Sequence, residues 1–324
     1  MSDYPNPLIE QRADPHIYLH TDGTYYFIAS VPEYDRLEIR RSPTLLGLAT
    51  APATVIWHKP DYGPMSALIW APELHFIENQ WVIYFAAAPS PEIVDGLFQH
   101  RMYALVCEDR DPITGTWQEK GRIATPIESF SLDGTHFMHQ GKSYYLWAQK
   151  DPMIRGNSNL YLAELANPWT LKTSPVMLSK PELPWEIVGF WVNEGPAVIT
   201  HGNRIFVTYS ASATDENYCI GLLWAEINSD LLNPDSWQKL SHPLFSTQRE
   251  NQQFGPGHNS FTLNEQGEYV LVYHARNYTK IEGDPLYDPN RHTRIKTFYW
   301  DQDNMPVFGS PQADNRPLVL QKHC

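Results

Sequence analysis

Apolar and polar positions alternate along this chain in short runs, and five successive stretches repeat the same order of runs. Each stretch opens with a small, acidic or proline-containing cluster, and these clusters begin at Asp14, Ala71, Asp133, Glu194 and Gly257. An apolar run and a turn signal follow, the turns being Asp22-Gly23, Asn79-Gln80, Gln140-Gly141, Gly202-Asn203 and Gln266-Gly267. The next run is aromatic and β-branched, as in Trp81–Phe85. Short apolar runs separated by such turns predict β-hairpins.

A third apolar run completes each stretch, and a tryptophan follows it in four of the five. The third runs are Leu37–Arg40, Met102–Val106, Leu160–Ala163, Gly221–Trp224 and Ile295–Phe298, and the tryptophans are Trp57, Trp117, Trp169 and Trp237. Counted from Asp14 through Glu73, Asp133 and Glu194 to His258, the intervals are 59, 60, 61 and 64 residues. Four strands within about 60 residues are typical of a propeller blade. We therefore predict an all-β, single-domain, five-bladed β-propeller over residues 1–324, with four antiparallel strands per blade.

The alternative fold is a β-sandwich, or two β-domains with accidental similarity between their strands. Neither requires five units to agree in the position of both the turn and the aromatic run. The tryptophan of each fourth strand is expected to pack between blades rather than to bind a ligand.

The charge and cysteine content of the chain exclude several classes of binding partner. The chain has 24 Lys and Arg against 37 Asp and Glu, a formal charge of −13, and no basic run, which argues against nucleic acid and an anionic membrane. The cysteines Cys107, Cys219 and Cys324 are scattered and odd in number, so neither zinc nor a disulfide framework is expected. No apolar stretch reaches 18 residues, and the N-terminus is polar, so we expect a cytoplasmic protein unless a leader has been removed.

Carboxyl groups gather at one register of the repeat. The first strand of a propeller blade lines the central channel, so the starts of these strands converge, and three of them carry Asp14, Asp133 and Glu194. Glu73 is taken as the corresponding residue of the second unit. Like charges placed together are costly unless they are paired or used. Apolar neighbours of Glu194 should raise its pKa, and two carboxyls in different protonation states are what glycoside hydrolysis requires. Turn caps or salt bridges are the alternative for each acid taken alone.

The ordered motifs resemble glycoside hydrolase family 43. They are Ala13–Pro15, Trp70–Glu73, Leu132–Gly134, Asn193–Pro196 and Gly255–Asn259. The resemblance implies a five-bladed propeller that inverts the anomeric centre. It implies that Asp14 is the general base, that Glu194 is the general acid, and that Asp133 orients the sugar and tunes the acid. His258 matches a histidine that helps to hold a hydrated metal ion, usually calcium.

Three further residues are candidates for substrate binding. Trp70 and Trp191 border catalytic motifs, where they either stack on a sugar or pack around the acids. Arg276 sits where the family places an arginine in the sugar pocket, with a scaffold ion pair as the alternative. Because calcium prefers oxygen ligands, a single histidine leaves a structural or electrostatic role open for the ion.

The resemblance also suggests a substrate. Family members act mainly on α-L-arabinofuranosides and β-D-xylosides, and many of the β-xylosidases carry a C-terminal β-sandwich that this chain is expected to lack. The motifs Phe190–Pro196 and Phe254–His258 resemble those of single-domain, exo-acting arabinofuranosidases. We therefore expect release of terminal L-arabinose from arabinan-type oligosaccharides, with residues 90–100 and 282–291 walling the pocket.

Three rival functions remain open at this point. They are a β-xylosidase on the same scaffold, a non-catalytic sugar-binding or protein-interaction propeller, and a retaining fructan-active propeller. The last would need a different arrangement of the acids, including an Arg-Asp-Pro motif in mid-chain. The sequence does not indicate the oligomeric state.

Overall fold

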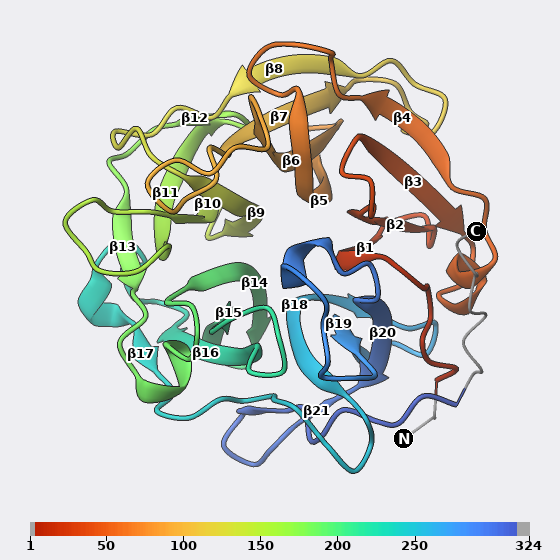
Figure 1. Ribbon diagram of the computed structural model, residues 1–324, viewed down its shortest axis with the longest axis vertical. Helices are drawn as coiled ribbons and strands as arrows, with labels where there is room; N and C mark the ends of the chain where they lie inside the picture. The colour runs from red at the N-terminus through yellow and green to blue at the C-terminus, as the bar shows by residue number, and fades with distance from the viewer. Residues whose placement is uncertain (1–3, 316–324) are drawn as a thin grey trace.

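The computed structural model describes residues 4–315 as five antiparallel β-sheets set around a central axis (Figure 1). The first strand of each sheet lies nearest the axis, and the later strands follow outward. The predicted five-bladed propeller is confirmed, and the hairpin turns fall at or within one residue of the predicted positions.

The first two blades have four strands each. Blade 1 consists of β1 (Ala13–Leu19), β2 (Tyr25–Ser30), β3 (Arg36–Ser42) and β4 (Thr54–His58). Blade 2 consists of β5 (Ala67–Ile77), β6 (Gln80–Ala88), β7 (Arg101–Cys107) and β8 (Gln118–Arg122).

The third and fourth blades have short outer strands. Blade 3 consists of β9 (Ser131–His139), β10 (Lys142–Gln149) and β11 (Asn159–Asn167), with both β12 (Thr170–Leu171) and β13 (Val176–Ser179) paired to β11. Blade 4 consists of β14 (Asn193–His201), β15 (Arg204–Ala211), β16 (Cys219–Glu226) and β17 (Gln238–Lys239).

The fifth blade is closed by the start of the chain. Its strands are β18 (Phe254–Leu263), β19 (Tyr269–Arg276) and β20 (His292–Thr297). Leu8 N–H donates to Thr293 O (2.9 Å), and Thr293 N–H donates to Ile9 O (2.9 Å). The Asn6 side chain pairs with both backbone groups of Ile295, at 2.8 and 3.0 Å. The segment around residues 6–9 therefore takes the outer position that a fourth strand fills in the other blades.

Smaller elements connect the blades. They are the ribbon β21 (Tyr299–Trp300) with β22 (Pro306–Val307), and the 3₁₀ turns η1 (Leu46–Ala49), η2 (Pro184–Glu186), η3 (Pro234–Ser236) and η4 (Pro285–Tyr287). Within residues 4–315, none of the helical segments has the length and hydropathy to cross a membrane. Cys107 and Cys219 are buried free thiols, whereas Cys324 lies outside the described residues.

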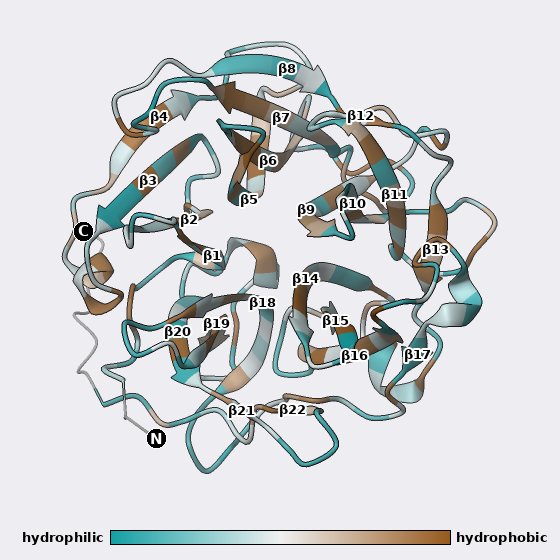
Figure 2. Cartoon of the chain, turned by 180° about the vertical axis from the view of Figure 1, so that it is seen from behind, coloured by the Kyte–Doolittle hydropathy of each residue, from teal (hydrophilic) through white to brown (hydrophobic). Residues whose placement is uncertain are grey.

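The core lies between the faces of neighbouring blades. Figure 2 shows hydrophobic residues concentrated in strands such as β6 and β7, with hydrophilic residues on the outer β8. Tyr84 of blade 2 and Tyr145 of blade 3 meet with ring centroids 5.1 Å apart. Trp57 packs against Phe85 of the next blade at 5.2 Å, which agrees with the predicted packing role of the fourth-strand tryptophans.

Each innermost strand contains a β-bulge at the same place. The pairing register shifts there, and one residue has a left-handed backbone: Asp14 (φ 54°), Ala71 (44°), Asp133 (55°), Gly195 (53°) and His258 (45°). A bulge bends its strand and re-aims the side chain, so the five blades direct one residue each toward the mouth of the axis.

The bulges correct two details of the predicted register. In the fourth blade the residue that corresponds to Asp14 is Gly195, so Glu194 lies one residue before that register. The residue of the second blade that corresponds to Asp14 is Ala71, not Glu73. Glu73 lies two residues further along β5, where its carboxylate faces His16 of blade 1 at 3.8 Å. Sequence spacing missed this because a bulge adds a residue to one strand without changing the hydrophobic pattern on either side of it.

Candidate active site

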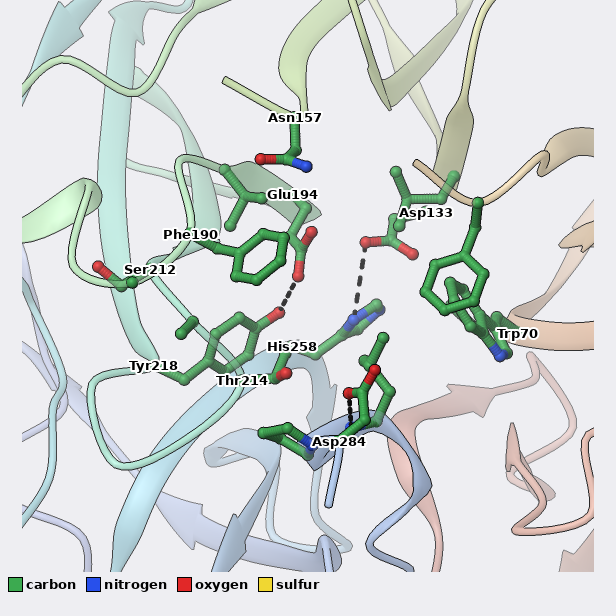
Figure 3. Close-up of a pocket in the computed structure, with 18 of the residues that line it drawn as sticks. Trp70, Asp133, Asn157, Phe190, Glu194, Ser212, Thr214, Tyr218, His258 and Asp284 are labelled. Atoms are coloured by element: carbon green, nitrogen blue, oxygen red, sulfur yellow. Dashed lines mark hydrogen bonds and ion pairs between the residues drawn. The ribbon is translucent and has the colours of Figure 1, made fainter. Parts of the chain in front are cut away.

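A cavity of about 580 Å³ opens at the mouth of the propeller axis (Figure 3). Its size is that of an ordinary small-ligand site. Residues from all five blades line it, among them Asp14, Trp70, Asp133, Glu194, Tyr218, His258 and Arg291. The three predicted catalytic carboxyls therefore share one cavity, although 180 residues separate the first from the last.

Asp14 is held as an ionised carboxylate. Its Oδ2 accepts a hydrogen bond from Ser30 Oγ (2.6 Å), and Arg291 Nη1 lies 3.4 Å from Oδ1. Burial by itself raises the pKa of Asp14. The neighbouring His258, Arg291 and His274, together with the Ser30 bond, outweigh burial, so the pKa lies well below its usual range. Arg291 is the full positive charge in this group, because His274 Nδ1 accepts a bond from the Asp14 backbone N–H (3.0 Å) and has no proton there.

Glu194 is held toward its protonated form. Burial raises the pKa of Glu194 to about 7. The Tyr218 hydroxyl, which donates to Oε1 at 2.8 Å, opposes part of that rise, and the negative charge of Asp14 adds to it. The expected raised pKa is thus present, and its main cause is loss of water around the carboxyl.

Asp133 connects the third and fourth blades. Its Oδ2 accepts a hydrogen bond from the backbone N–H of Gly195 (2.9 Å), the residue that follows Glu194. Burial raises the pKa of Asp133 well above its usual value, and the charges of Glu194 and Asp14 raise it further. Asp133 and Glu194 therefore hold a proton between them at a pH where isolated carboxyls are both ionised.

His258 lies between two of the carboxyls. Its Nδ1 is 3.3 Å from Asp14 Oδ1 and 3.8 Å from Asp133 Oδ2. Its backbone N–H donates to Ser210 Oγ (2.7 Å), which fixes the bulge. Burial lowers the pKa of His258, although Asp14 opposes this, so the neutral imidazole is favoured.

A calcium ion at His258 was predicted as a hydrated ion, which would take most of its ligands from water rather than from protein oxygens. Calcium takes six to eight oxygen ligands. Within the described residues, the group of three His or acidic donor atoms close enough to share an ion is His16, Glu73 and His75, which does not include His258. Calcium at His258 therefore stays a prediction.

The two tryptophans proposed for substrate binding differ in position. Trp70 lines the cavity, where its ring stacks on His100 at 3.8 Å and forms part of the wall. Trp191 is not among the residues that line the cavity, and the guanidinium of Arg155 lies 3.9 Å over its ring. Its neighbour Phe190, which is 54% exposed, lines the cavity instead.

Arg276, expected in the sugar pocket, does not line the cavity. Its guanidinium is buried and donates to Asp288 Oδ1 (3.2 Å), Thr214 O (2.6 Å) and Pro285 O (2.6 Å). These bonds hold two loops together, which was the alternative role considered for it. The arginine in the cavity is Arg291, which also donates to the Tyr34 hydroxyl (3.0 Å).

Two loops form much of the rim, as expected from the sequence. Ile93 and Gly96–Phe98 come from the loop between β6 and β7, and Asp284–Leu286 come from the loop between β19 and β20. The Tyr34 hydroxyl donates to Leu286 O (2.5 Å), which ties the second loop to blade 1.

Comparison with known proteins gives consistent matches. The family model described as "Glycosyl hydrolases family 43" matches residues 4–306. A relative named extracellular exo-alpha-(1->5)-L-arabinofuranosidase, from Streptomyces avermitilis, is 55% identical over 96% of this chain and 64% of its own length. A protein of the same name from Streptomyces chartreusis is 51% identical over 87% of this chain and 85% of its own. This chain thus spans somewhat less than two thirds of the first relative.

A solved structure agrees with these relatives. The crystal structure of an alpha-L-arabinofuranosidase from Lactobacillus brevis superposes with a TM-score of 0.96 and 58% identity, covering 97% of this chain and 99% of the other.

The comparison overturns the expected cellular location. A cytoplasmic protein was expected from the polar N-terminus, but the two Streptomyces relatives are named extracellular. That expectation is wrong, because the composition of a folded domain does not record the compartment in which it works.

Proposed function

The chain belongs to glycosyl hydrolase family 43, and from this premise we propose that it releases terminal α-L-arabinofuranosyl residues from arabinan or arabino-oligosaccharides with inversion. Asp14 is the general base in this proposal, and Glu194 is the general acid. The names of the three similar proteins support the choice of sugar.

One observation carries the proposal. Two carboxyls in one cavity have pKa values displaced in opposite directions, that of Asp14 downward and that of Glu194 upward to about 7. An ionised and a protonated carboxyl at the same pH are the pair required for acid and base catalysis of glycoside hydrolysis.

The chemical steps follow from these two states. Asp14 removes a proton from a water molecule, whose oxygen attacks the anomeric carbon. The bond from that carbon to the leaving oxygen breaks, and Glu194 gives its proton to the leaving oxygen. In inverting enzymes the two carboxyls stand about 6.5–9.5 Å apart to leave room for the water. Both carboxyls must exchange protons with solvent before the next turnover.

The other cavity residues support this reaction. Asp133 binds the backbone amide beside Glu194 and its negative charge disfavours ionisation of the acid, so its proposed role is to keep the acid protonated and to orient the sugar. Arg291 keeps Asp14 ionised, and Trp70 supplies an apolar wall for a sugar face. No step in this mechanism requires a metal ion.

The proposal is tested by assaying 4-nitrophenyl α-L-arabinofuranoside and 4-nitrophenyl β-D-xyloside in parallel, followed by NMR of the first anomer formed from arabinotriose. The expected result is faster arabinoside turnover and a β-anomer product from the α-linked substrate. Faster xyloside turnover would establish the β-xylosidase alternative. Binding of arabinotriose without cleavage at any pH would establish a sugar-binding propeller, and an α-anomer product would refute inversion.

A further inference from the structure

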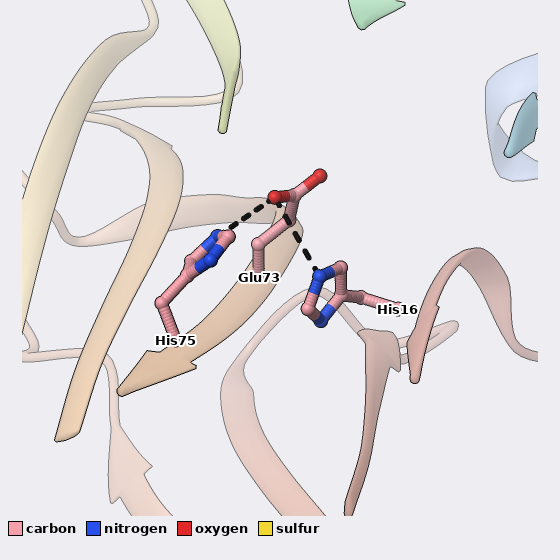
Figure 4. A group of neighbouring side chains, drawn as sticks. All are labelled: His16, Glu73 and His75. Carbon is pink, nitrogen blue, oxygen red and sulfur yellow. Dashed lines mark hydrogen bonds and ion pairs between the residues drawn. The ribbon is translucent and has the colours of Figure 1, made fainter. Parts of the chain in front are cut away.

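We propose that the propeller axis binds one divalent transition-metal ion through His16, Glu73 and His75, at a site distinct from the catalytic carboxyls. This proposal does not depend on the sugar that the enzyme cleaves. Its subject is a cluster that the catalytic mechanism above does not use (Figure 4).

The first argument is position. His16 lies on β1, and Glu73 and His75 lie on β5, so two adjacent innermost strands contribute. His16 and Glu73 each come two residues after the bulge residue of their strand, Asp14 and Ala71. The same repeat that gathers side chains at the mouth of the axis thus gathers a second set one step along the channel. In Figure 4 both imidazoles point toward the same carboxylate oxygen.

The second argument is distance. Glu73 Oε2 is 2.9 Å from His75 Nε2 and 3.8 Å from His16 Nε2, and the three donor atoms all lie within 4.8 Å of one another. Ligand atoms about 2.0–2.2 Å from a shared zinc ion stand about 3–3.7 Å apart. Side-chain shifts below 1 Å would bring these three into range.

The third argument is charge. Glu73 is 7% exposed, and its carboxylate contacts only the two histidines among the ion pairs of the described residues, with no Lys or Arg within 4 Å. A buried carboxylate without a cation carries a large desolvation penalty. A divalent ion would supply the missing positive charge in a channel that already holds Asp14, Asp133 and Glu194.

The fourth argument is the surroundings of the cluster. The Thr135 hydroxyl, on the next innermost strand, hydrogen-bonds the Glu73 side chain and would orient it as a ligand. His16 Nδ1 and the Tyr145 hydroxyl are buried and have no hydrogen-bond partner among the described residues. Buried polar atoms without a partner call for an explanation, and an ordered water or an ion near the cluster would provide one.

The donor types select the class of ion. Two imidazole nitrogens and one carboxylate oxygen suit zinc, cobalt, nickel, iron or manganese rather than calcium, which prefers oxygens alone. The ordinary alternative is that His75 Nε2–H donates a hydrogen bond to Glu73 and no ion binds. The two readings differ in a measurable way, because metal binding must displace that proton.

The test is a metal titration of tag-free protein that has been stripped with a chelator and dialysed. Calorimetry with ZnCl₂, CoCl₂ and CaCl₂ is expected to show one equivalent of zinc or cobalt bound, a rise in melting temperature, and a visible absorption band for the cobalt form. Glu73→Gln and His75→Gln should weaken the affinity by at least about tenfold. His136→Gln is the matched control, because its ring lies 5.8 Å from that of His75 in the same channel but outside the cluster.

Two outcomes would overturn the proposal. They are no zinc or cobalt binding by the folded wild-type protein, and zinc affinity in Glu73→Gln and His75→Gln that equals that of the wild type. Circular dichroism of each variant establishes folding before titration. If Glu73→Gln or His75→Gln does not fold without metal, His16→Gln is titrated in its place. Failure of the titration would leave the arabinoside assay unaffected, so the two proposals fail separately.

Discussion

At the scale of single residues, the site works because identical chemical groups are placed in different surroundings. Asp14 has the guanidinium of Arg291 and the hydroxyl of Ser30 beside it, whereas Glu194 accepts a bond from the Tyr218 phenol. Burial acts on both in the same direction, so the neighbours decide which carboxyl keeps its proton.

The acid and base roles predict different responses when the substrate has a leaving group that departs without a proton. Glu194→Ala should lower turnover of arabino-oligosaccharides by about 10²–10⁴-fold but affect 4-nitrophenyl arabinoside far less, because only the sugar leaving group needs a proton. Asp14→Ala should damage both substrates. Measuring kcat/KM for each substrate in each variant checks this, and an equal loss throughout would mean that the roles are wrongly assigned.

Tyr218 is a positioning residue whose removal should appear in the pH profile. Its hydroxyl bond lowers the pKa of Glu194, so Tyr218→Phe should raise that pKa further above about 7. Because the acid must be protonated, the alkaline limb of the kcat/KM profile should move to higher pH. Phenylalanine keeps the ring that stacks on His274 at 5.7 Å, so the fold should be retained.

Tyr278→Phe is the control for that experiment, since its hydroxyl bonds Asp288 rather than a catalytic carboxyl. Its alkaline limb should coincide with that of the wild type. A limb unmoved in Tyr218→Phe would show that the phenol does not tune Glu194.

The sequence predicted the three carboxyls of the cavity but not all of the other side chains that line it. The three carboxyls were found because the repeat fixes where a strand begins. Trp191 does not line the cavity because the repeat does not fix which of two neighbouring residues faces it, and Phe190 lies there instead. Arg276 does not line it either, because the repeat does not place the loop between β19 and β20 that carries Arg291 into the cavity. Tyr218 carried no signal, because an aromatic residue before a strand looks like core.

At the scale of elements, the bulge in each innermost strand is the feature that aims the catalytic side chains. Left-handed backbone is several-fold enriched in Asp and His and easiest for Gly, and four of the five bulge positions have one of these residues. The hydrophobic alternation predicted the strand segments on either side of each bulge but did not predict the bulge itself.

Gly195→Ala tests the bulge of the fourth blade. A Cβ there would lie 3.1 Å from the His258 ring, on a residue with φ of 53°. Left-handed strain should lower the unfolding free energy by about 1–2 kcal/mol, and displacement of His258 should lower kcat/KM by about 10–100-fold. Urea denaturation and steady-state kinetics measure the two effects.

Gly267→Ala is the control, because it introduces the same backbone strain as Gly195→Ala without a contact to another side chain. Its φ is 78°, but a Cβ there meets no atom within 4 Å. It should lose comparable stability and keep wild-type kcat/KM. Unchanged kcat/KM in both variants would show that the bulge of the fourth blade does not contribute to catalysis.

At the scale of the whole molecule, a ring of blades needs a closure between its first and last members. Here residues near the start of the chain pair with β20 of the fifth blade, and Asn6 acts in place of a backbone strand by bonding both polar groups of Ile295. The sequence predicted five equal blades and could not show this arrangement, because a polar asparagine in an irregular segment has no strand pattern.

Asn6→Ala should weaken the closure without touching the cavity. It leaves the buried N–H and C=O of Ile295 unpaired, which costs about 1–3 kcal/mol of unfolding free energy. The urea midpoint should fall, with kcat/KM unchanged on the folded protein. Asn228→Ala, at an exposed position, should stay within about 0.5 kcal/mol of wild type, and equal midpoints for the two variants would contradict the closure.

Because the same bulge recurs in every blade, one bulge position can be substituted to place a new side chain in the cavity. Positions 14, 71, 133 and 258 present one side chain each to the same cavity, on left-handed backbones that position 195 shares. Of these, Ala71 alone has a side chain that is neither functional nor suited to its backbone. A small library of Asn, Asp, His and Gly at position 71 would therefore introduce new chemistry facing the substrate, at a point where the scaffold already favours those substituents.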